Sequence, residues 1–242
     1  LIMFMIISMA TTILVAQYIG SGNREKLSTL YTLSVMVNMI FSAVIMIIIL
    51  FFADDIFRFM KVPDDVVGDS ITFIKWTGAF IFLQGLIASF SAIFKSNRMM
   101  FHTMVISIVI NLVNVIGNAF LIYGIGPLPS LGVAGSAHAT NIGRLVGVIL
   151  YIILFIKNFE TKLSLKAMNP FPFRDLSKLL GIGVPSGGES FSYTMAMTFI
   201  LKTINTFGTY VINTRMIANT FAWFSFLYAS AVGQASQVVI GN

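Results

Sequence analysis

Long apolar stretches run through almost the whole of this 242-residue sequence, and they restrict its fold more than any other feature. An α-helix rises 1.5 Å per residue, so about 20 apolar residues are needed to cross the roughly 30 Å of hydrocarbon in a bilayer. Runs of about this length predict seven membrane-spanning helices, near residues 3–20, 28–52, 70–94, 101–124, 132–157, 179–204 and 209–238. The predicted fold class is therefore an all-α membrane protein, a polytopic bundle of transmembrane helices.

The composition supports this class and argues against a nucleic-acid partner. Hydrophobic residues make up 57% and charged residues 10% of the sequence, whereas charged residues make up about 25% of a typical soluble domain. The net charge of +6 could suggest binding to nucleic acid, but the Lys and Arg residues are scattered over short connections, as the orientation signals of membrane proteins are. We therefore expect the lipid bilayer as a partner and no nucleic acid.

Enzyme signatures are absent from these 242 residues. The sequence contains no HExxH, G-x-S-x-G or Walker A motif, it has no cysteine, and His102 and His138 lie in different predicted segments. We expect neither an enzyme nor a bound cofactor. An ATP-driven pump would need a nucleotide-binding domain that no stretch of this sequence could supply, which leaves transport coupled to an ion gradient.

Charged residues divide the predicted connections into two kinds. The first, third and fifth connections are basic, the second is acidic, and the fourth is uncharged. By the positive-inside rule, the basic connections lie in the cytoplasm. The longest of them, 158–178, carries Pro170 and Pro172 and is predicted to be a cytoplasmic linker between an N-terminal lobe, 1–157, and the start of a C-terminal lobe, 179–242.

Glu189 is the only acidic residue inside any of the long apolar stretches. It lies about ten residues, or roughly 15 Å, into its predicted helix, which is near the bilayer midplane. A charge there costs roughly 2.5–3.5 kcal/mol, so such residues usually face a cavity or a partner and often bind protons, ions or substrate. Pro185, one turn earlier, frees a backbone carbonyl. The alternative is a structural carboxylate that the hydroxyls of Ser186, Ser192 and Tyr193 satisfy.

Two predicted helices each carry a stripe of polar side chains. The first stripe consists of Ser107, Asn111, Asn114 and Asn118, and the second of Asn219, Trp223, Ser230, Gln234 and Gln237. On each helix these positions fall within an arc of about 60°. Each stripe could line a cavity or form hydrogen bonds between helices. Trp223 could bind an organic cation through its ring face or pack against a neighbouring helix.

The helix predicted at 132–157 has a face of small residues and one deep charge. The small residues are Gly132, Ser136, Thr140, Gly143 and Gly147. Such a face usually permits close packing of helices. Arg144 lies off this face and is deep enough to need a partner. We hypothesise that this partner is a carboxylate on a helix that precedes the sequence given.

Residues Ile110 to Thr140, an asparagine-rich helix, a hairpin with glycines and prolines, and the start of the next helix, resemble the multidrug and toxic compound extrusion (MATE) family. Supporting matches are Leu14 to Gly20, Leu180 to Ser186 and Gly233 to Asn242. The resemblance covers essentially the whole chain and corresponds to family helices two to eight. It implies about seven of twelve helices, which the family arranges in two pseudo-symmetric six-helix lobes.

The resemblance also implies a function and a set of site residues. Family members are antiporters that export cationic or amphipathic small molecules in exchange for H+ or Na+. The polar positions of the first lobe fall on Asn114, Asn118 and Thr140, and having Asn118 rather than Asp removes one ionisable group. Many members place a coupling Glu about two turns after the helix-opening proline, whereas Glu189 follows Pro185 by one turn.

Taken together, the sequence predicts a secondary active transporter of the plasma membrane, monomeric and without a cofactor, whose coupling ion is H+ or Na+. The candidate cation- and substrate-binding residues are Glu189, Tyr193, Asn114, Asn118, Thr140, Asn219, Trp223 and Gln234. Na+ at Glu189 is the one metal ion that this set could bind. Two alternatives stay open: a related flippase for lipid-linked saccharides, which would have a more cationic cleft, and a membrane scaffold that transports nothing.

Overall fold

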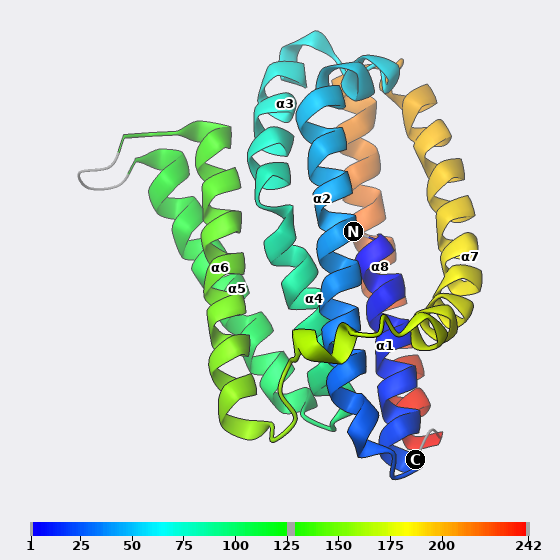
Figure 1. Ribbon diagram of the computed structural model, residues 1–242. Helices are drawn as coiled ribbons and strands as arrows, with labels where there is room; N and C mark the ends of the chain where they lie inside the picture. The colour runs from blue at the N-terminus through cyan, green and yellow to red at the C-terminus, as the bar shows by residue number, and fades with distance from the viewer. Residues whose placement is uncertain (1, 125–128, 241–242) are drawn as a thin grey trace.

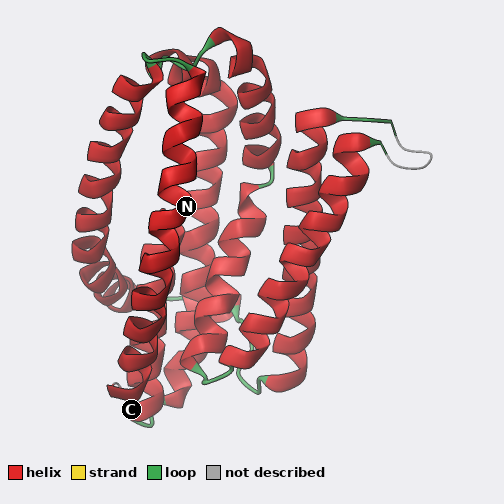
Figure 2. Ribbon diagram, turned by 180° about the vertical axis from the view of Figure 1, so that it is seen from behind, coloured by secondary structure: helices red, strands yellow, loops and turns green. Residues whose placement is uncertain are grey.

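The computed structural model describes residues 2–124 and 129–240, and in these ranges every regular element is a helix. The α-helices are α1 (Ile2–Gly20), α2 (Leu27–Phe59), α3 (Asp64–Ala79), α4 (Ile81–Ser96), α5 (Met100–Tyr123), α6 (Gly132–Asn158), α7 (Phe173–Asn205) and α8 (Thr209–Ile240). Short 3-10 turns lie at Arg24–Lys26 and Leu165–Met168. The helices run roughly along one common direction (Figures 1 and 2), which confirms the predicted all-α bundle.

Each of the seven predicted segments is helical, but one of them is not a single helix. The segment predicted at 70–94 begins earlier and consists of α3 and α4, which meet at Phe80 with a bend of 53°. Phe80 has left the helical conformation there, with φ −108° and ψ 20°. Two residues earlier, Gly78 lets α3 approach the side chain of Ile49 on α2 closely. The segment predicted at 70–94 is therefore two helices joined by a bend and not one continuous helix.

Among the residues that the structure describes, three helices are long and apolar enough to cross a membrane on their own, namely α2, α5 and α6. The bent pair α3–α4 would make a fourth span if it crosses as one unit. The described apolar part of α1, Phe4–Gly20, is shorter. For α1, α7 and α8, the spanning assignment therefore rests on the sequence.

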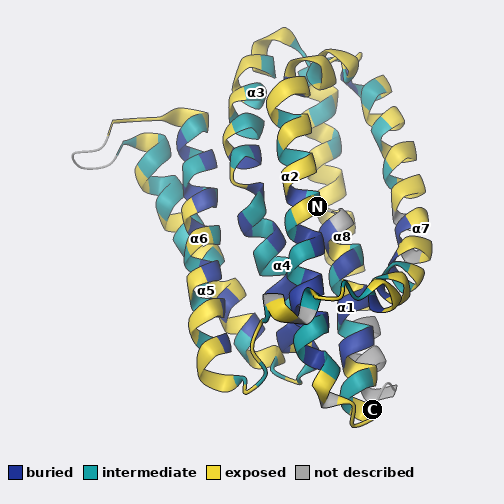
Figure 3. Ribbon diagram, in the orientation of Figure 1, coloured by how far each residue is buried: buried dark blue, intermediate teal, exposed yellow. Residues whose placement is uncertain are grey.

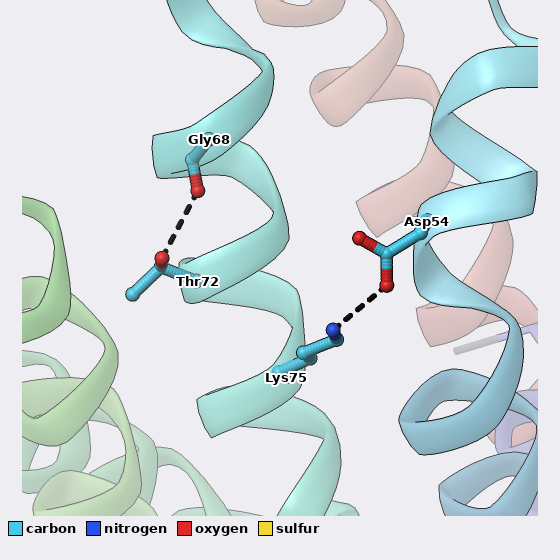
Figure 4. Close-up of polar contacts among 4 residues, drawn as sticks. All are labelled: Asp54, Gly68, Thr72 and Lys75. Atoms are coloured by element: carbon cyan, nitrogen blue, oxygen red, sulfur yellow. Dashed lines mark hydrogen bonds and ion pairs between the residues drawn. The ribbon is translucent and has the colours of Figure 1, made fainter.

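The connections with opposite charge lie at opposite ends of the bundle. In Figure 1 the basic connections that follow α1, α4 and α6 lie toward the lower end, and the acidic connection between α2 and α3 lies at the top. The turn between α7 and α8 is also at the top, where Asn205 Nδ2 donates a hydrogen bond to the carbonyl oxygen of Met60 at 2.8 Å. At the same end Lys75 and Asp54 form a 2.8 Å ion pair between α3 and α2 (Figure 4), and both side chains are exposed.

The predicted linker is shorter than the sequence suggested. Helix α7 begins at Phe173, so the residues from 173 to 178 are its first turns and not part of the connection. Pro172 immediately precedes the helix, and Asp175 lies in its first turn, where a negative charge favours the positive end of the helix dipole. These two residues start the helix about six positions before the apolar run begins.

An aromatic cluster joins α2, α4 and α6 in the lower half of the bundle. Phe90 and Phe94 of α4 contact the ring of Tyr151 on α6, with ring centroids 6.1 and 5.3 Å apart. Tyr31 of α2 meets Phe155 of α6 edge to face at 6.2 Å. All five side chains are buried. Burial and ring contacts of this kind anchor the helices near their basic ends.

Buried hydroxyls and amides join α1, α2 and α4 above this cluster. Asn38 Nδ2 donates to Ser89 Oγ at 2.7 Å, and Thr11 Oγ1 donates to Ser34 Oγ at 2.9 Å. Each of these side chains is buried. In an apolar surrounding, an unmet polar group is costly, so these pairs fix how the three helices face one another.

The closest helix contact in the bundle is the hairpin of α5 and α6. A Cβ added at Gly135 would overlap the backbone carbonyl of Leu121, and one added at Gly143 would lie 3.0 Å from the carbonyl oxygen of Ile110. A Cβ at Gly147 would overlap the side chain of Ile110. At Gly143 and Gly147 the small-residue face of α6 therefore packs closely against α5, whereas a Cβ at Gly132, on the same predicted face, would meet nothing within 4 Å.

Burial is uneven along the chain. Buried residues are concentrated in α1, α2, α4 and α6, whereas most described residues of α8 are exposed (Figure 3). The exposed side chains of α8 include Phe221, Trp223, Phe224 and Tyr228. An apolar face of this extent is suited to contact with lipid or with other helices.

We predict that Gly135→Ala destabilises the protein, by about 1–3 kcal/mol, because the added methyl group meets a backbone carbonyl that cannot move aside by rotating a side chain. The measurement is thermal unfolding of the detergent-solubilised protein.

Gly181→Ala is the matched control, because a Cβ at Gly181 meets nothing within 4 Å. Alanine has the higher helix propensity, so this variant should unfold at the same or a slightly higher temperature. Equal effects of the two substitutions would contradict the close α5–α6 packing.

Candidate functional site

A chain of hydrogen bonds links the polar stripe of α5 to α6. Asn118 Nδ2 donates to Asn114 Oδ1 at 3.1 Å, and Asn114 Nδ2 donates to Thr140 Oγ1 at 3.0 Å. The hydroxyl of Thr140 in turn donates to the carbonyl oxygen of Ser136 at 3.0 Å. Three candidate residues, Asn114, Asn118 and Thr140, are thus brought together.

Glycines on both helices make this contact short. A Cβ at Gly117 of α5 would lie 3.0 Å from Cβ of Ala139, and one at Gly143 of α6 would lie 3.6 Å from Cβ of Asn114. Larger residues at these positions would separate the helices and with them Asn114 and Thr140. The packing face of α6 and the polar stripe of α5 are therefore parts of one arrangement.

A pocket of about 330 Å³ opens beside this chain of hydrogen bonds, between α4, α5 and α6. Its lining consists of Gln84, Ile87, Ser107, Ile110, Asn111, Asn114, Thr140 and Arg144. The stripe of α5 therefore does both things that the sequence allowed. Asn114 and Asn118 bond along and between helices, while Ser107, Asn111 and Asn114 line a pocket.

The sequence analysis missed Gln84 of α4 and left Arg144 outside the candidate site. Gln84 carries the only amide in the apolar run 70–94, which is the signal that could have singled it out. Arg144 is partly buried, and its guanidinium shares the pocket with the candidate residues. The pocket thus has one formal positive charge and amide and hydroxyl groups around it.

The candidate residues of α7 and α8 do not form a closed site in the described part of the chain. Tyr193 and Trp223 have exposed fractions of 64% and 55%, and Asn219 is also exposed. Trp223 contacts Phe226 of its own helix edge to face, at 5.4 Å between ring centroids. The side chains of Glu189 and Gln234 lie outside the described residues.

The backbone around Glu189 is helical and lies next to α1. Helix α7 continues through Pro185, and the glycines on either side of this proline face α1. A Cβ at Gly183 would lie 3.1 Å from Cγ2 of Ile6, and one at Gly187 would lie 2.8 Å from its Cδ1. The stretch of α7 that contains Glu189 therefore runs directly against α1.

A second polar cluster, which the sequence analysis did not anticipate, joins α1 to the first turns of α7. Tyr18 donates its hydroxyl hydrogen to Asp175 Oδ1 at 3.1 Å and accepts a hydrogen bond from Lys178 Nζ at 2.9 Å. Asp175 is buried. Asp175 and Lys178 fall within the predicted linker, 158–178, where a spacing of three residues implies no contact. On the helix that the structure shows, the same spacing puts both side chains on one face.

This cluster borders a second pocket. The pocket has a volume of about 390 Å³ and is lined by Leu14, Gln17, Tyr18, Ser21, Lys178 and Ile182. It lies at the basic end of the bundle, far along α1 from Ile6. In the described part of the chain no three His, Cys, Asp or Glu side chains are grouped as a metal site would need.

Comparison with known proteins gives relatives for nearly the whole chain. The MatE family profile matches residues 1–120. An uncharacterized transporter of Bacillus subtilis, YisQ, is 32% identical over 242 residues, which is all of this chain and 53% of that protein. A probable multidrug resistance protein, NorM of Thermotoga maritima, is 24% identical over 97% of this chain and 50% of its own length.

Solved structures give the same picture of the fold. The inward-facing form of a multidrug resistance MATE family transporter of the MOP superfamily matches with a TM-score of 0.75 and 21% identity, over 84% of this chain and 46% of the other. The bent form of the Vibrio cholerae MATE transporter VcmN matches with a TM-score of 0.75 and 19% identity, over 92% and 50%. The chain spans about half the length of these proteins.

We predict that Asn114 and Thr140 are energetically coupled. A double-mutant cycle of Asn114→Leu and Thr140→Val, followed by thermal or denaturant unfolding, should give a coupling free energy of about 0.6 kcal/mol and at most about 1.7 kcal/mol, the range for hydrogen bonds between membrane helices.

Thr198→Val serves as the control partner in the same cycle, since its hydroxyl donates to the carbonyl of Thr194 in its own helix. It should show no coupling to Asn114. A coupling no larger for Thr140 than for Thr198 would mean that the α5–α6 hydrogen bond is not formed.

We predict that Tyr18→Phe destabilises the contact between α1 and α7 by about 1 kcal/mol, because the variant keeps the ring but loses hydrogen bonds to two charged groups, one of them exposed. Tyr210→Phe is the control, since Tyr210 has an exposed fraction of 83%. Unfolding temperatures that are equal for the two variants would argue against the cluster.

Proposed function

We propose that the full-length protein is an antiporter that exports organic cations, drugs or other amphipathic compounds in exchange for H+ or Na+. The chain itself belongs to the MATE family of membrane transporters. The observation that carries this proposal is the polar pocket beside Asn114 and Thr140, within a hairpin of two helices that are each long and apolar enough to cross a bilayer. Transport of a solute across hydrocarbon needs such a polar surface inside the bundle.

The chemistry of the pocket suits amphipathic compounds. Amide and hydroxyl groups lie beside apolar side chains such as Ile87 and Ile110. A volume of about 330 Å³ is at the lower end of ligand pockets, which typically have 300–1,000 Å³. Asn114, Asn118 and Thr140 would hold the polar groups of the substrate, and the apolar walls would hold the rest.

The coupling ion binds at Glu189 in this proposal. An ionised carboxylate in an apolar helix is unfavourable until a cation or a proton neutralises it. If the carboxylate must always bind either the coupling ion or a cationic substrate, one can leave only when the other binds. Neither then crosses the membrane without exchange. Tyr193, one turn further along α7, would assist Glu189 by hydrogen bonding.

The polar stripe of α8 would complete the substrate path. Asn219 and Trp223 are exposed in the described part of the chain, so both are accessible to a ligand or to further helices. The ring face of Trp223 can bind an organic cation, an interaction worth roughly 0.5–2 kcal/mol. Gln234 follows on the same stripe by sequence.

The membrane orientation is part of the same proposal. In this proposal the helices up to α6 form an N-terminal lobe, the residues between α6 and α7 connect the lobes, and α7 and α8 are the start of a C-terminal lobe. The gathering of basic connections at one end of the bundle supports a cytoplasmic position for that end in the plasma membrane. The transporter works as a monomer in this scheme, since one chain supplies both lobes.

The proposed coupling role is tested with Glu189→Gln in the full-length protein. Efflux of ethidium from proteoliposomes, driven by a pH gradient or by a Na+ gradient, should fall at least about tenfold, because the neutral amide can neither release a proton nor attract a cation. Whichever gradient drives the wild-type protein identifies the coupling ion.

Glu160→Gln, in the connection between α6 and α7, is the matched control and should leave efflux unchanged, because Glu160 is exposed and outside the helices. Glu189→Asp should keep part of the activity. If Glu189→Gln reconstitutes at the normal level and transports like the wild type, the assigned role is wrong.

A further inference from the structure

Arg144 occupies an unusual position for a charged side chain. It is on α6, one turn after Thr140, and it is one of the residues that line the pocket between α4, α5 and α6. The residue is partly buried, in a helix whose other exposed positions near it are apolar, such as Ile142 and Leu145. Charged residues in such helices usually face a cavity and a partner.

No partner for this charge is found among the described side chains. The ion pair between Lys75 and Asp54 joins α3 to α2 and does not include Arg144. The pocket around Arg144 is lined by amides, hydroxyls and two isoleucines, and no lining residue is acidic. A guanidinium has five N–H donors and no acceptor, so it needs oxygen atoms to complete its surroundings.

The neighbours of Arg144 complement a carboxylate. Gln84 of α4 and Asn111 of α5 line the same pocket, and each has a side-chain NH2 group that can donate hydrogen bonds. Arginine binds a carboxylate through two parallel N–H···O bonds, which are stronger than bonds between neutral groups. A bare cation in this pocket would instead face a positive charge at short range.

We propose that the pocket between α4, α5 and α6 is a carboxylate-binding site in which Arg144 is the charged ligand. The carboxylate can come from two sources: from a side chain of the full-length protein that is not among those described, or from a molecule that enters the pocket. This inference deepens the proposed function and rests on it in one respect, because it concerns the same pocket that would hold the substrate. The pocket takes a carboxylate group, and cation binding is left to the proposed site at Glu189.

The test uses the full-length protein in detergent and measures thermal unfolding with two probes of similar shape and opposite charge, sodium benzoate and benzylammonium chloride. The variants are Arg144→Gln, which removes the charge, and Arg144→Lys, which keeps the charge without the planar fork. Arg174→Gln is the control for loss of a positive charge, because Arg174 is exposed in the first turn of α7.

Two results would support the proposal and separate the sources. If benzoate, at about ten times its dissociation constant, raises the unfolding temperature of the wild type by about 2–4 °C but not that of Arg144→Gln, the site takes the carboxylate of a ligand. If benzoate has no effect but Arg144→Gln unfolds at a lower temperature than both Arg144→Lys and Arg174→Gln, the carboxylate belongs to the protein.

Other results would overturn the proposal. These are stabilisation by benzoate that is equally large in Arg144→Gln, or no effect of benzoate together with equal unfolding temperatures for Arg144→Gln and Arg174→Gln. Benzylammonium is the probe of opposite charge, and stabilisation by it that does not depend on Arg144 belongs to the proposed cation site at Glu189. If Arg144→Gln does not fold, the test uses chemical modification of arginine side chains in the wild-type protein by phenylglyoxal.

The proposal then requires Arg144 to react more slowly than Arg174, either without a probe or in the presence of benzoate. Equal reactivity of the two residues in both conditions counts against the site. None of these readouts depends on transport, so they can fail or succeed independently of the antiport function.

Discussion

The close approach of α5 and α6 is the constraint on which the rest of the site depends. Gly135 lies against the carbonyl of Leu121, and Gly143 lies against that of Ile110, so the two backbones are nearly in contact. Only at this separation can Asn114 reach Thr140 across the helices. Arg144 follows Gly143 but lies outside this packing face, and it lines the pocket that α4 completes. The glycines thus allow the helices to come close enough for the polar side chains beside them to meet.

Much of the arrangement could be predicted from the sequence, because the patterns concerned are local. The apolar runs identified the helices, the spacing of Asn114 and Asn118 placed them on one face, and the small residues of α6 identified its packing face. The bend at Phe80 and the cluster at Tyr18 could not be predicted. Phe80 lies in a continuous apolar run with no proline, and Tyr18 meets its partners 157 residues or more along the chain. Such features depend on tertiary contacts.

The two proposed sites differ in charge and in how far the described chain encloses them. The pocket at Arg144 is built from three helices that pack around a buried core, whereas Glu189, Asn219 and Trp223 belong to α7 and α8, which are largely exposed. Opposite charges in separate places allow a transporter to treat an anionic group and a cationic group as different ligands. A substitution at one of these sites then leaves the charge of the other site unchanged.

Helix α7 is fastened to the preceding helices at both of its ends. Near its start, Asp175 and Lys178 hold Tyr18, and at its end Asn205 holds the carbonyl of Met60. A rigid rotation of α7 would have to break the hydrogen bonds at one end before it could move the other. Pro185, between the two attachments, interrupts the backbone ladder of the helix, so bending there dissociates the movement of one half from that of the other. We therefore expect α7 to move by bending at Pro185 and not by rotating as one rigid helix.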